Sequence, residues 1–178
     1  MAVDFAAALA SGQVGEGRIA QWLLARGWNV LPVYETELDT GKGPRLYTPD
    51  RPVIATDMFI FRADSALWIE AKTKTRFTWY RIAEQWETGI DLRHYLDYLR
   101  VDDATPWDVW LMFLHTCCDP DPRDLLHGCP RECPTGLFAR RLSTLRRCES
   151  HRSDRHGSSG MVYWAAHDLT PLADLWEV

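Results

Sequence analysis

The amino-acid sequence predicts an α/β protein with a mixed central sheet flanked by helices. Short apolar runs typical of strands alternate with longer stretches of helical periodicity. Their order along the chain is helix, strand, strand, strand, helix and strand, which indicates a mixed sheet. The chain has 178 residues, of which 46% are hydrophobic. This size leaves room for one domain with a hydrophobic core, so residues 1–178 are predicted to form a single domain.

The spacing of apolar residues and the positions of glycine and proline predict the first helix, strand and loop. Apolar residues recur at helical spacing through Gly15–Arg26, and Gly27 follows where a helix ends. The short apolar segment Trp28–Tyr34 is predicted to be a strand. Glu35–Pro52 is rich in glycine, proline, threonine and charge, so it is predicted to be a loop.

A hairpin is expected in the middle of the chain. Asp57–Phe61 and Ala66–Lys72 read as strands, and Arg62–Ser65 between them as a tight turn. Thr78–Arg100 is the longest stretch of helical character, and Trp107–Leu114 is a further apolar strand. These elements, from about residue 15 to 115, form most of the predicted core.

The character of the sequence changes after His115. Residues 116–160 contain all five cysteines, four prolines and a cluster of arginines, and are predicted to be an insertion that carries one short helix, Leu137–Arg147. Met161–Ala165 reads as the final strand, and Leu169–Trp176 closes the chain. Residues 161–178 are therefore assigned to the core.

Composition sets the expected environment. No apolar run approaches the roughly 18 residues needed to cross a membrane, and Met1–Ala10 lacks the basic region of a signal peptide. We therefore expect a cytoplasmic protein without a membrane partner. In that compartment the cysteines are expected to be thiols or metal ligands.

One strand carries residues suited to metal-dependent chemistry. Side chains alternate along a strand, so Glu70 and Lys72 share a face. The apolar run before them should be buried, and an acid at the end of a buried strand is costly unless it is paired or binds a metal. The hairpin would bring Asp57 beside Glu70. Two carboxylates form a hard oxygen site that suits Mg²⁺.

The chemistry expected of this site is phosphodiester hydrolysis. A metal held by Asp57 and Glu70 would polarise the phosphate and acidify a water molecule. Lys72 would then stabilise the developing negative charge. The alternative is an ordinary surface Glu/Lys pair, since Glu-x-Lys is common. Lysine is scarce here, however, because only three occur among 20 basic residues and two of them follow Glu70 closely.

These residues resemble the PD-(D/E)XK nuclease superfamily, which includes many restriction endonucleases, archaeal Holliday-junction resolvases and phage recombination nucleases. The resemblance covers roughly residues 15–114. It implies a restriction-endonuclease-like fold and Mg²⁺- or Mn²⁺-dependent hydrolysis of DNA, with a homodimer or a recombination or repair partner needed to cut both strands. It also implies that Glu16, on the first helix, reaches the metal. Gln85 would position substrate or water, although Gly89 stands where the usual tyrosine is expected.

Two assignments within this resemblance stay open. A literal Pro-Asp occurs at Pro49-Asp50, but Asp57 is preferred over Asp50 because it opens an apolar strand. His94 is interpreted either as a half-buried histidine of the long helix or as a catalytic base.

Basic residues provide candidate contacts to nucleic acid. The net charge of −5 does not indicate a general nucleic-acid coating protein. Between Arg131 and Arg155, however, seven arginines stand against three acidic residues. The alternative is a solvated surface. The candidate phosphate contacts are Lys74, Arg76, Arg81, Arg140, Arg141, Arg146 and Arg147.

The cysteine-rich segment suggests a second, structural metal. Cys129 and Cys133 form a Cys-x₃-Cys pair, and Cys148 with His151 forms a Cys-x₂-His pair, a ligand set suited to structural Zn²⁺. Free thiols are the alternative interpretation. The competing function is accordingly a non-catalytic or zinc-organised nucleic-acid-binding or interaction module built on a degenerate nuclease fold.

Overall fold

The computed structural model describes residues 5–33, 45–157 and 159–178, including side chains from residue 14 onward. A six-stranded sheet with the strand order β1-β4-β5-β8-β9-β12 forms its centre. These strands are β1 (Asn29–Pro32), β4 (Met58–Arg62), β5 (Ser65–Lys74), β8 (Val109–His115), β9 (Gly136–Arg141) and β12 (Thr170–Ala173).

The central sheet is mixed. β5 and β8 run parallel, with Glu70 opposite Leu111, and the other neighbouring strands are antiparallel. β4 and β5 form the expected hairpin, in which Met58 pairs with Ile69. A parallel pair requires a crossover connection, and here the chain between β5 and β8 includes a helix, as such connections usually do. The predicted α/β class with a mixed central sheet flanked by helices is confirmed.

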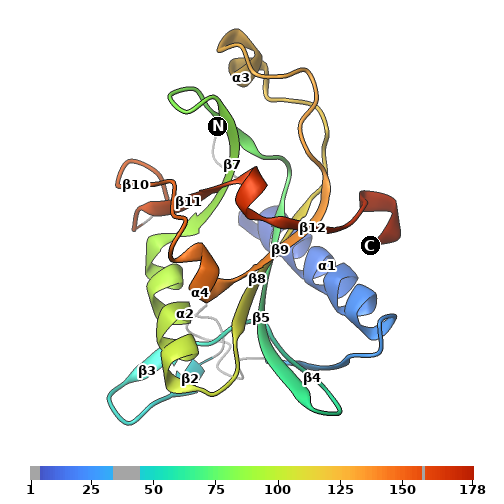
Figure 1. Cartoon of the computed structure of the whole chain (residues 1–178), viewed down its shortest axis with the longest axis vertical. Helices are drawn as coiled ribbons and strands as arrows, with labels where there is room; N and C mark the ends of the chain where they lie inside the picture. Colours follow the sequence, from blue (N-terminus) through green and yellow to red (C-terminus); the bar gives the residue numbers. More distant parts are fainter. Residues whose placement is uncertain (1–4, 34–44, 158) are drawn as a thin grey trace.

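Helix α1 (Phe5–Leu24) covers one face of this sheet (Figure 1). Its buried residues Ile19, Trp22 and Leu23 pack with apolar residues of the sheet, including Ile69 and Ala71 of β5. The helical spacing of these apolar residues explains both the helix and the face that it buries.

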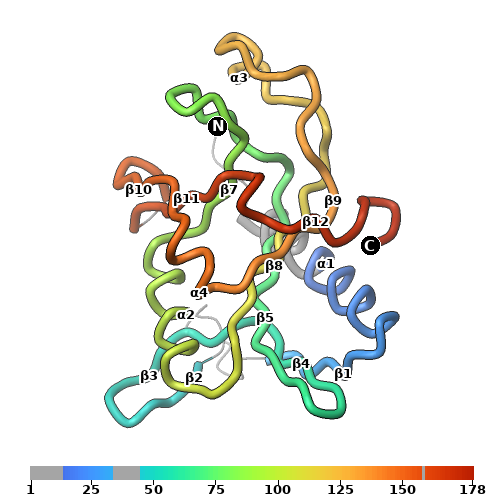
Figure 2. Tube along the Cα trace, viewed as in Figure 1, coloured from blue at the N-terminus to red at the C-terminus, as the bar shows by residue number. Residues whose placement is uncertain are grey.

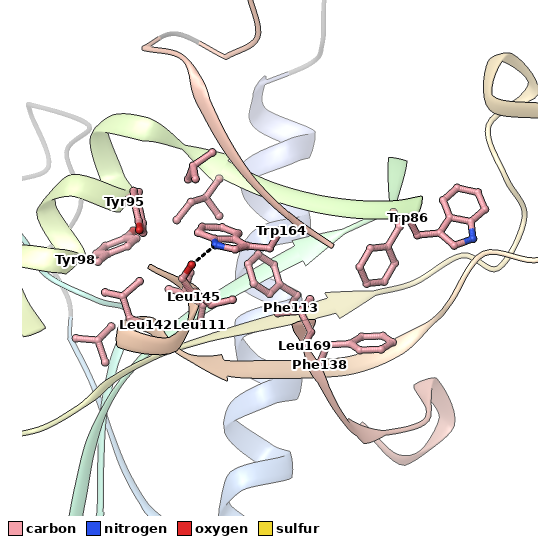
Figure 3. Packing of buried hydrophobic residues seen from close by; sticks show 14 of the residues in the cluster. Trp86, Tyr95, Tyr98, Leu111, Phe113, Phe138, Leu142, Leu145, Trp164 and Leu169 are labelled. Carbon is pink, nitrogen blue, oxygen red and sulfur yellow. Dashed lines mark hydrogen bonds between the residues drawn. The ribbon is translucent and has the colours of Figure 1, made fainter. Parts of the chain in front are cut away.

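The opposite face packs against helix α2 (Leu92–Ala104) and a smaller antiparallel sheet with the order β10-β11-β7-β6. Trp164 lies at the centre of this second core, and its indole Nε1 donates a hydrogen bond to the carbonyl of Leu145 at 2.9 Å (Figure 3). The strands of the smaller sheet are β6 (Thr78–Tyr80), β7 (Gln85–Asp91), β10 (His151–Ser153) and β11 (Met161–Ala165).

Shorter elements lie at the periphery. The strands β2 (Arg45–Tyr47) and β3 (Pro52–Ile54) pair beside α2. Helix α3 (Pro122–Leu126) is the tip of an arm that extends from the end of β8 (Figure 2). The remaining elements are α4 (Leu142–Leu145) and the 3₁₀ turns Ala166–Asp168 and Leu175–Glu177. None of the helices in the described ranges is long and apolar enough to span a membrane.

The structure corrects the long predicted helix Thr78–Arg100. Strands β6 and β7 occupy its first half, and the helix begins only at Leu92, where the Asp91 side chain accepts a hydrogen bond from the Arg93 amide. Every residue from 86 to 90 is buried, so β7 has no exposed face and lacks the alternation that identifies a strand. The predicted loop Glu35–Pro52 lies outside the described residues up to 44, and beyond it β2 forms.

The predicted insertion 116–160 is also corrected in part. The helix expected over Leu137–Arg147 is a strand for half its length, because β9 lies between β8 and β12 in the central sheet and α4 follows it. Strand β10 joins the smaller sheet. Only residues 116–135, which carry α3, extend from the body as an arm (Figure 1).

Candidate active site

The hairpin of β4 and β5 brings the three principal candidate residues together. Asp57 immediately precedes β4 and lies one residue beyond the Met58–Ile69 pair, next to Glu70. Its Oδ2 accepts a hydrogen bond from the backbone amide of Ala71 at 2.9 Å. Glu70 and Lys72 follow on the same face of β5, as the strand alternation predicted, and their side chains form an ion pair.

Glu70 is the most buried charged group of the site. Its side chain is 0% exposed. Glu70 Oε1 accepts hydrogen bonds from Lys72 Nζ and from the hydroxyl of Tyr98, the latter at 2.5 Å. Oε2 is buried without a hydrogen-bond partner among the described residues. A buried carboxylate oxygen that is left unpaired costs free energy, so this atom is available to a ligand.

The charges of the site strongly influence one another. Burial raises the pKa of Glu70 to about 7, the nearby Asp57 carboxylate also raises it, and Lys72 and the Tyr98 hydroxyl oppose the shift. Burial alone would lower the pKa of Lys72, but the carboxylates of Glu70 and Asp57 outweigh it and raise that pKa above its usual value. Lys72 is therefore a permanent cation beside two acids.

Helix α1 adds a third carboxylate. Burial raises the pKa of Glu16, the charge of Asp57 raises it further and Lys72 lowers it, so Glu16 belongs to the same group of charges. Gly15 makes this placement possible. A Cβ atom at Gly15 would lie 2.7 Å from Cβ of Thr73 on β5, so only glycine allows the helix to approach the strand this closely.

Helix α2 supplies Tyr98, which the sequence did not assign to the site, and His94, for which it left a catalytic role open. Tyr98 is 2% exposed and its hydroxyl donates to Glu70. His94, one helical turn earlier, is half-buried, and both burial and the charge of Lys72 lower its pKa. The spacing of four residues that places His94 and Tyr98 on one helical face was the available signal. Tyr98 was missed as a partner of Glu70 because the contact depends on how α2 packs against β5.

Gln85 and Asp50 lie away from this group. Gln85 begins β7, where its Nε2 donates to Glu87 Oε1 at 2.8 Å and to Ser150 Oγ at 3.2 Å. The prediction that Gln85 lies on the long helix is therefore wrong. Asp50 is exposed in the turn between β2 and β3, where it lines a shallow pocket with Arg51 and Arg100.

The four predicted zinc ligands are not assembled into one site. Cys133 Sγ contacts the carbonyl of Phe77 at 3.9 Å, and Cys148 Sγ contacts that of Thr144 at 3.3 Å, beyond the C-terminal end of β9. His151 lies in the smaller sheet beside Glu87. Cys129 is buried on the α3 arm. The zinc interpretation of Cys129, Cys133, Cys148 and His151 is corrected, because the intervening segment forms β9 and α4 instead of a compact knuckle.

The predicted phosphate contacts are spread over several surfaces. Lys74 ends β5, where burial and the charge of Lys72 lower its pKa to about 8. Arg141 forms an ion pair with Asp108 at 2.5 Å, and Arg140 donates to Thr170 Oγ1 at 3.0 Å. Arg146 and Arg147 are exposed after α4, Arg76 precedes β6, and Arg81 follows β6.

Carboxylates gather around Lys72. Three carboxylates, Glu16, Asp57 and Glu70, surround the single ammonium group of Lys72, which leaves an excess of negative charge if all are ionised. Over the described part of the chain, no three His, Cys, Asp or Glu residues are already grouped as a metal site, because Glu70 is turned to Lys72 and Tyr98. The unpaired Glu70 Oε2 is nevertheless the kind of oxygen atom that serves as a ligand of a hard divalent cation.

The mixed sheet with α1 on one face and α2 on the other, together with acids on its central hairpin, defines the restriction-endonuclease-like fold. No family model matches the chain, and no curated protein matches it in sequence. The expected fold is confirmed by its similarity to one solved structure.

The chain is similar to Hjc, a Holliday junction resolvase from the archaeal hyperthermophile Archaeoglobus fulgidus. The TM-score is 0.50 at 8% sequence identity, over 88% of this chain and 90% of that one. The chain also matches D212, a nuclease from a fusselovirus, with a TM-score of 0.41 at 11% identity, over 99% of this chain and 90% of that one.

Proposed function

We propose that this protein is a Mg²⁺- or Mn²⁺-dependent nuclease that hydrolyses phosphodiester bonds in DNA. The observation that carries the proposal is Glu70, a carboxylate that is fully buried, holds one unpaired oxygen and lies between Asp57 and Lys72. Burying a carboxylate with an unpaired oxygen lowers the stability of the fold. Such groups are found mainly where they bind a ligand or take part in a reaction. The fold of known nucleases adds support.

Glu16, Asp57 and Glu70 would hold the cation. When bound, the cation would supply the Lewis-acid charge that assists attack on a phosphodiester. Asp57 is already oriented by the Ala71 amide, and Glu70 by the Tyr98 hydroxyl. These fixed positions reduce the reorganisation needed before substrate arrives.

Lys72 would act on the reacting phosphate. Its ammonium group stays protonated in the neutral range because the surrounding carboxylates favour the charged form. With Glu70 serving as a ligand of the cation, Lys72 would be placed to orient the attacking water and to stabilise negative charge that develops on the phosphate oxygens.

Cleavage of plasmid, linear and branched DNA in Mg²⁺ or Mn²⁺ tests the proposal. Lys72→Ala should lower the rate by about two to three orders of magnitude, or about 3–4 kcal/mol of transition-state stabilisation. Glu70→Gln, which preserves shape and removes charge, should also abolish metal-dependent cutting. Glu84→Gln is the matched control, because Glu84 is exposed in the turn between β6 and β7. Equal cutting by wild type and Lys72→Ala would remove this centre from consideration.

The closed ion pair between Lys72 and Glu70 favours a second candidate, a nucleic-acid-binding module that keeps the fold without catalysis. The same assay separates the two. A protein that binds DNA but neither cuts it nor takes up Mn²⁺ would belong to the second class. The zinc-organised version of this alternative loses its support with the dispersed cysteines.

A further inference from the structure

The smaller sheet has an outer face that the proposed nuclease centre does not use. Strand alternation and register place Tyr80, Glu87, Tyr163 and His151 on this face, one residue from each strand in the order β10-β11-β7-β6. The opposite face of the sheet, with Trp86 and Trp164, is buried in the core. A cleft of about 620 Å³ opens over the outer face.

Three aromatic rings line this cleft as a stack. The ring of His151 lies between those of Tyr80, at 4.3 Å and 15°, and Tyr163, at 4.6 Å and 8°. Gly89 makes room for the stack, because a Cβ atom there would lie 2.7 Å from the ring of Tyr163. Glycine at position 89 therefore has a structural reason within the smaller sheet, where β7 lies close to Val162 and Tyr163 of β11.

The His151 ring is held on three sides. Its two faces are stacked, and its buried Nδ1 lies 3.3 Å from Glu87 Oε2. Glu87 is 2% exposed and fixed in turn by Ser150 Oγ at 2.5 Å and by Gln85. The edge of the ring that carries Nε2 is therefore the part left to face the cleft.

The rim of the cleft is basic although the chain as a whole carries a charge of −5. Arg81 belongs to the turn after β6, Arg152 to β10, and Arg155 to the turn after β10, where the acidic rim residue Asp154 also lies. Arg152 pairs with Glu149. Within the part of the chain that the structure describes, no ion pair is recorded for Arg81 or Arg155. Aromatic rings beside unpaired arginines are the combination that binds unpaired nucleotides, with rings for the bases and arginines for the phosphates.

We propose that this cleft binds a single-stranded segment of nucleic acid, with at least one unpaired base against the Tyr80–His151–Tyr163 stack. The inference rests on the proposed function in naming the substrate class, since it makes the nuclease one that acts on DNA with an unpaired strand. The strand β6 that carries Tyr80 follows β5 after only three residues, so the cleft is linked directly to the strand of Glu70 and Lys72.

Binding without cleavage tests the cleft separately from catalysis. Fluorescence anisotropy of labelled dT15 and of a blunt duplex would be measured in EDTA. Wild type should bind dT15, and Tyr80→Ala should weaken that binding about tenfold or more, the effect of losing a stacked base. Duplex binding should change less than twofold. Tyr80→Phe keeps the ring and should bind as wild type does.

The control is Tyr47→Ala, because Tyr47 is 76% exposed on β2 and lies outside the cleft. Thermal unfolding of each variant would verify that it is folded. Unchanged dT15 binding by folded Tyr80→Ala, or an equal loss on duplex, would overturn the inference even if the protein cuts DNA. Loss of dT15 binding in Tyr80→Ala, with cutting unaffected by Lys72→Ala, would keep the cleft and reject the proposed nuclease centre. Retention of dT15 binding by Lys72→Ala together with loss of cutting would support both.

Discussion

Replacing Gly15 by alanine should loosen the contact between α1 and β5. The new Cβ atom would lie 2.7 Å from Cβ of Thr73 and still closer to its hydroxyl oxygen, and Thr73 Oγ1 is itself buried. Rotation of the threonine cannot relieve a contact with its own Cβ, so the helix or the strand must shift. Overpacking of this kind costs about 1–3 kcal/mol.

Gly17→Ala provides the matched comparison. Gly17 is in the same helix, and a Cβ atom there meets nothing within 4 Å. Each alanine gains about 0.5–1 kcal/mol over glycine in a helix interior. This gain is common to both variants, so the difference between their free energies of unfolding isolates the steric cost, about 1–3 kcal/mol.

Urea unfolding of the two variants and the wild type would measure this difference. Gly17→Ala should be at least as stable as wild type, and Gly15→Ala less stable than Gly17→Ala. Because the clash with Thr73 would shift the part of α1 that carries Glu16, Gly15→Ala should also lower metal-dependent cutting, whereas Gly17→Ala causes no such shift and should retain it. Equal stability of the two alanine variants would refute the close approach of α1 to Thr73.

Two further predictions concern buried polar groups. Tyr98→Phe removes the hydroxyl that holds Glu70, so the free energy of unfolding should fall by about 1.5–3 kcal/mol. The Mn²⁺ concentration for half-maximal cutting should rise about 10–100-fold. The control Tyr95→Phe loses a hydrogen bond of the same 2.5 Å length to Glu149, so it should lose stability without the change in metal dependence. A metal dependence that shifts equally in both variants would contradict the assigned role of Tyr98. Burial and the charge of Lys74 lower the pKa of His115 to about 3, so its neutral form stabilises the fold above the unfolded pKa of 6.5, and this stability is lost as the pH falls below 6.5. Between pH 7 and pH 5 the free energy of unfolding should fall by about 2 kcal/mol from this histidine alone. His115→Phe preserves the stack on Phe77, so its free energy of unfolding, measured by urea titration at both pH values, should fall by about 2 kcal/mol less than that of the wild type. Identical falls in both proteins would show that His115 is not the titrating group.

The central hairpin could be predicted from sequence because its signals are local. One short stretch of sequence contains Asp57, the turn before Ser65, and the spacing of two that puts Glu70 and Lys72 on one face. The structure forms this hairpin, with Glu70 and Lys72 paired on the same face of β5. The second half of helix α1 was predictable for the same reason, since Ile19, Trp22 and Leu23 recur at helical spacing and are buried together.

The elements that were missed depend on distant packing. β7 and the first part of β9 are buried on both faces, so their residues are apolar or small without alternation and resemble a buried helix. The first half of the supposed helix Thr78–Arg100 is held as strand by pairing with β11, which lies more than seventy residues later. Pattern alone carries no information about such a partner.

The site shows the same division. Glu16 and Tyr98 reach the hairpin from two helices on opposite faces of the sheet, and only their packing determines that they arrive there. The supposed zinc ligands had suitable spacing along the chain, yet β9 and α4 between the two pairs separate them in space. Whether residues 1–178 behave as a single domain stays a prediction.

The residue between Glu70 and Lys72 bears on how this sequence can drift over time. Ala71 offers its amide to Asp57 while its methyl group, 2% exposed, packs in the core cluster beneath α1 with Ile19 and Trp22. The middle position of Glu-x-Lys is therefore constrained in size in this chain. Descendants that acquire a larger residue at position 71 would need a compensating reduction on α1, so positions 71 and 19 or 22 should vary together in size among its relatives.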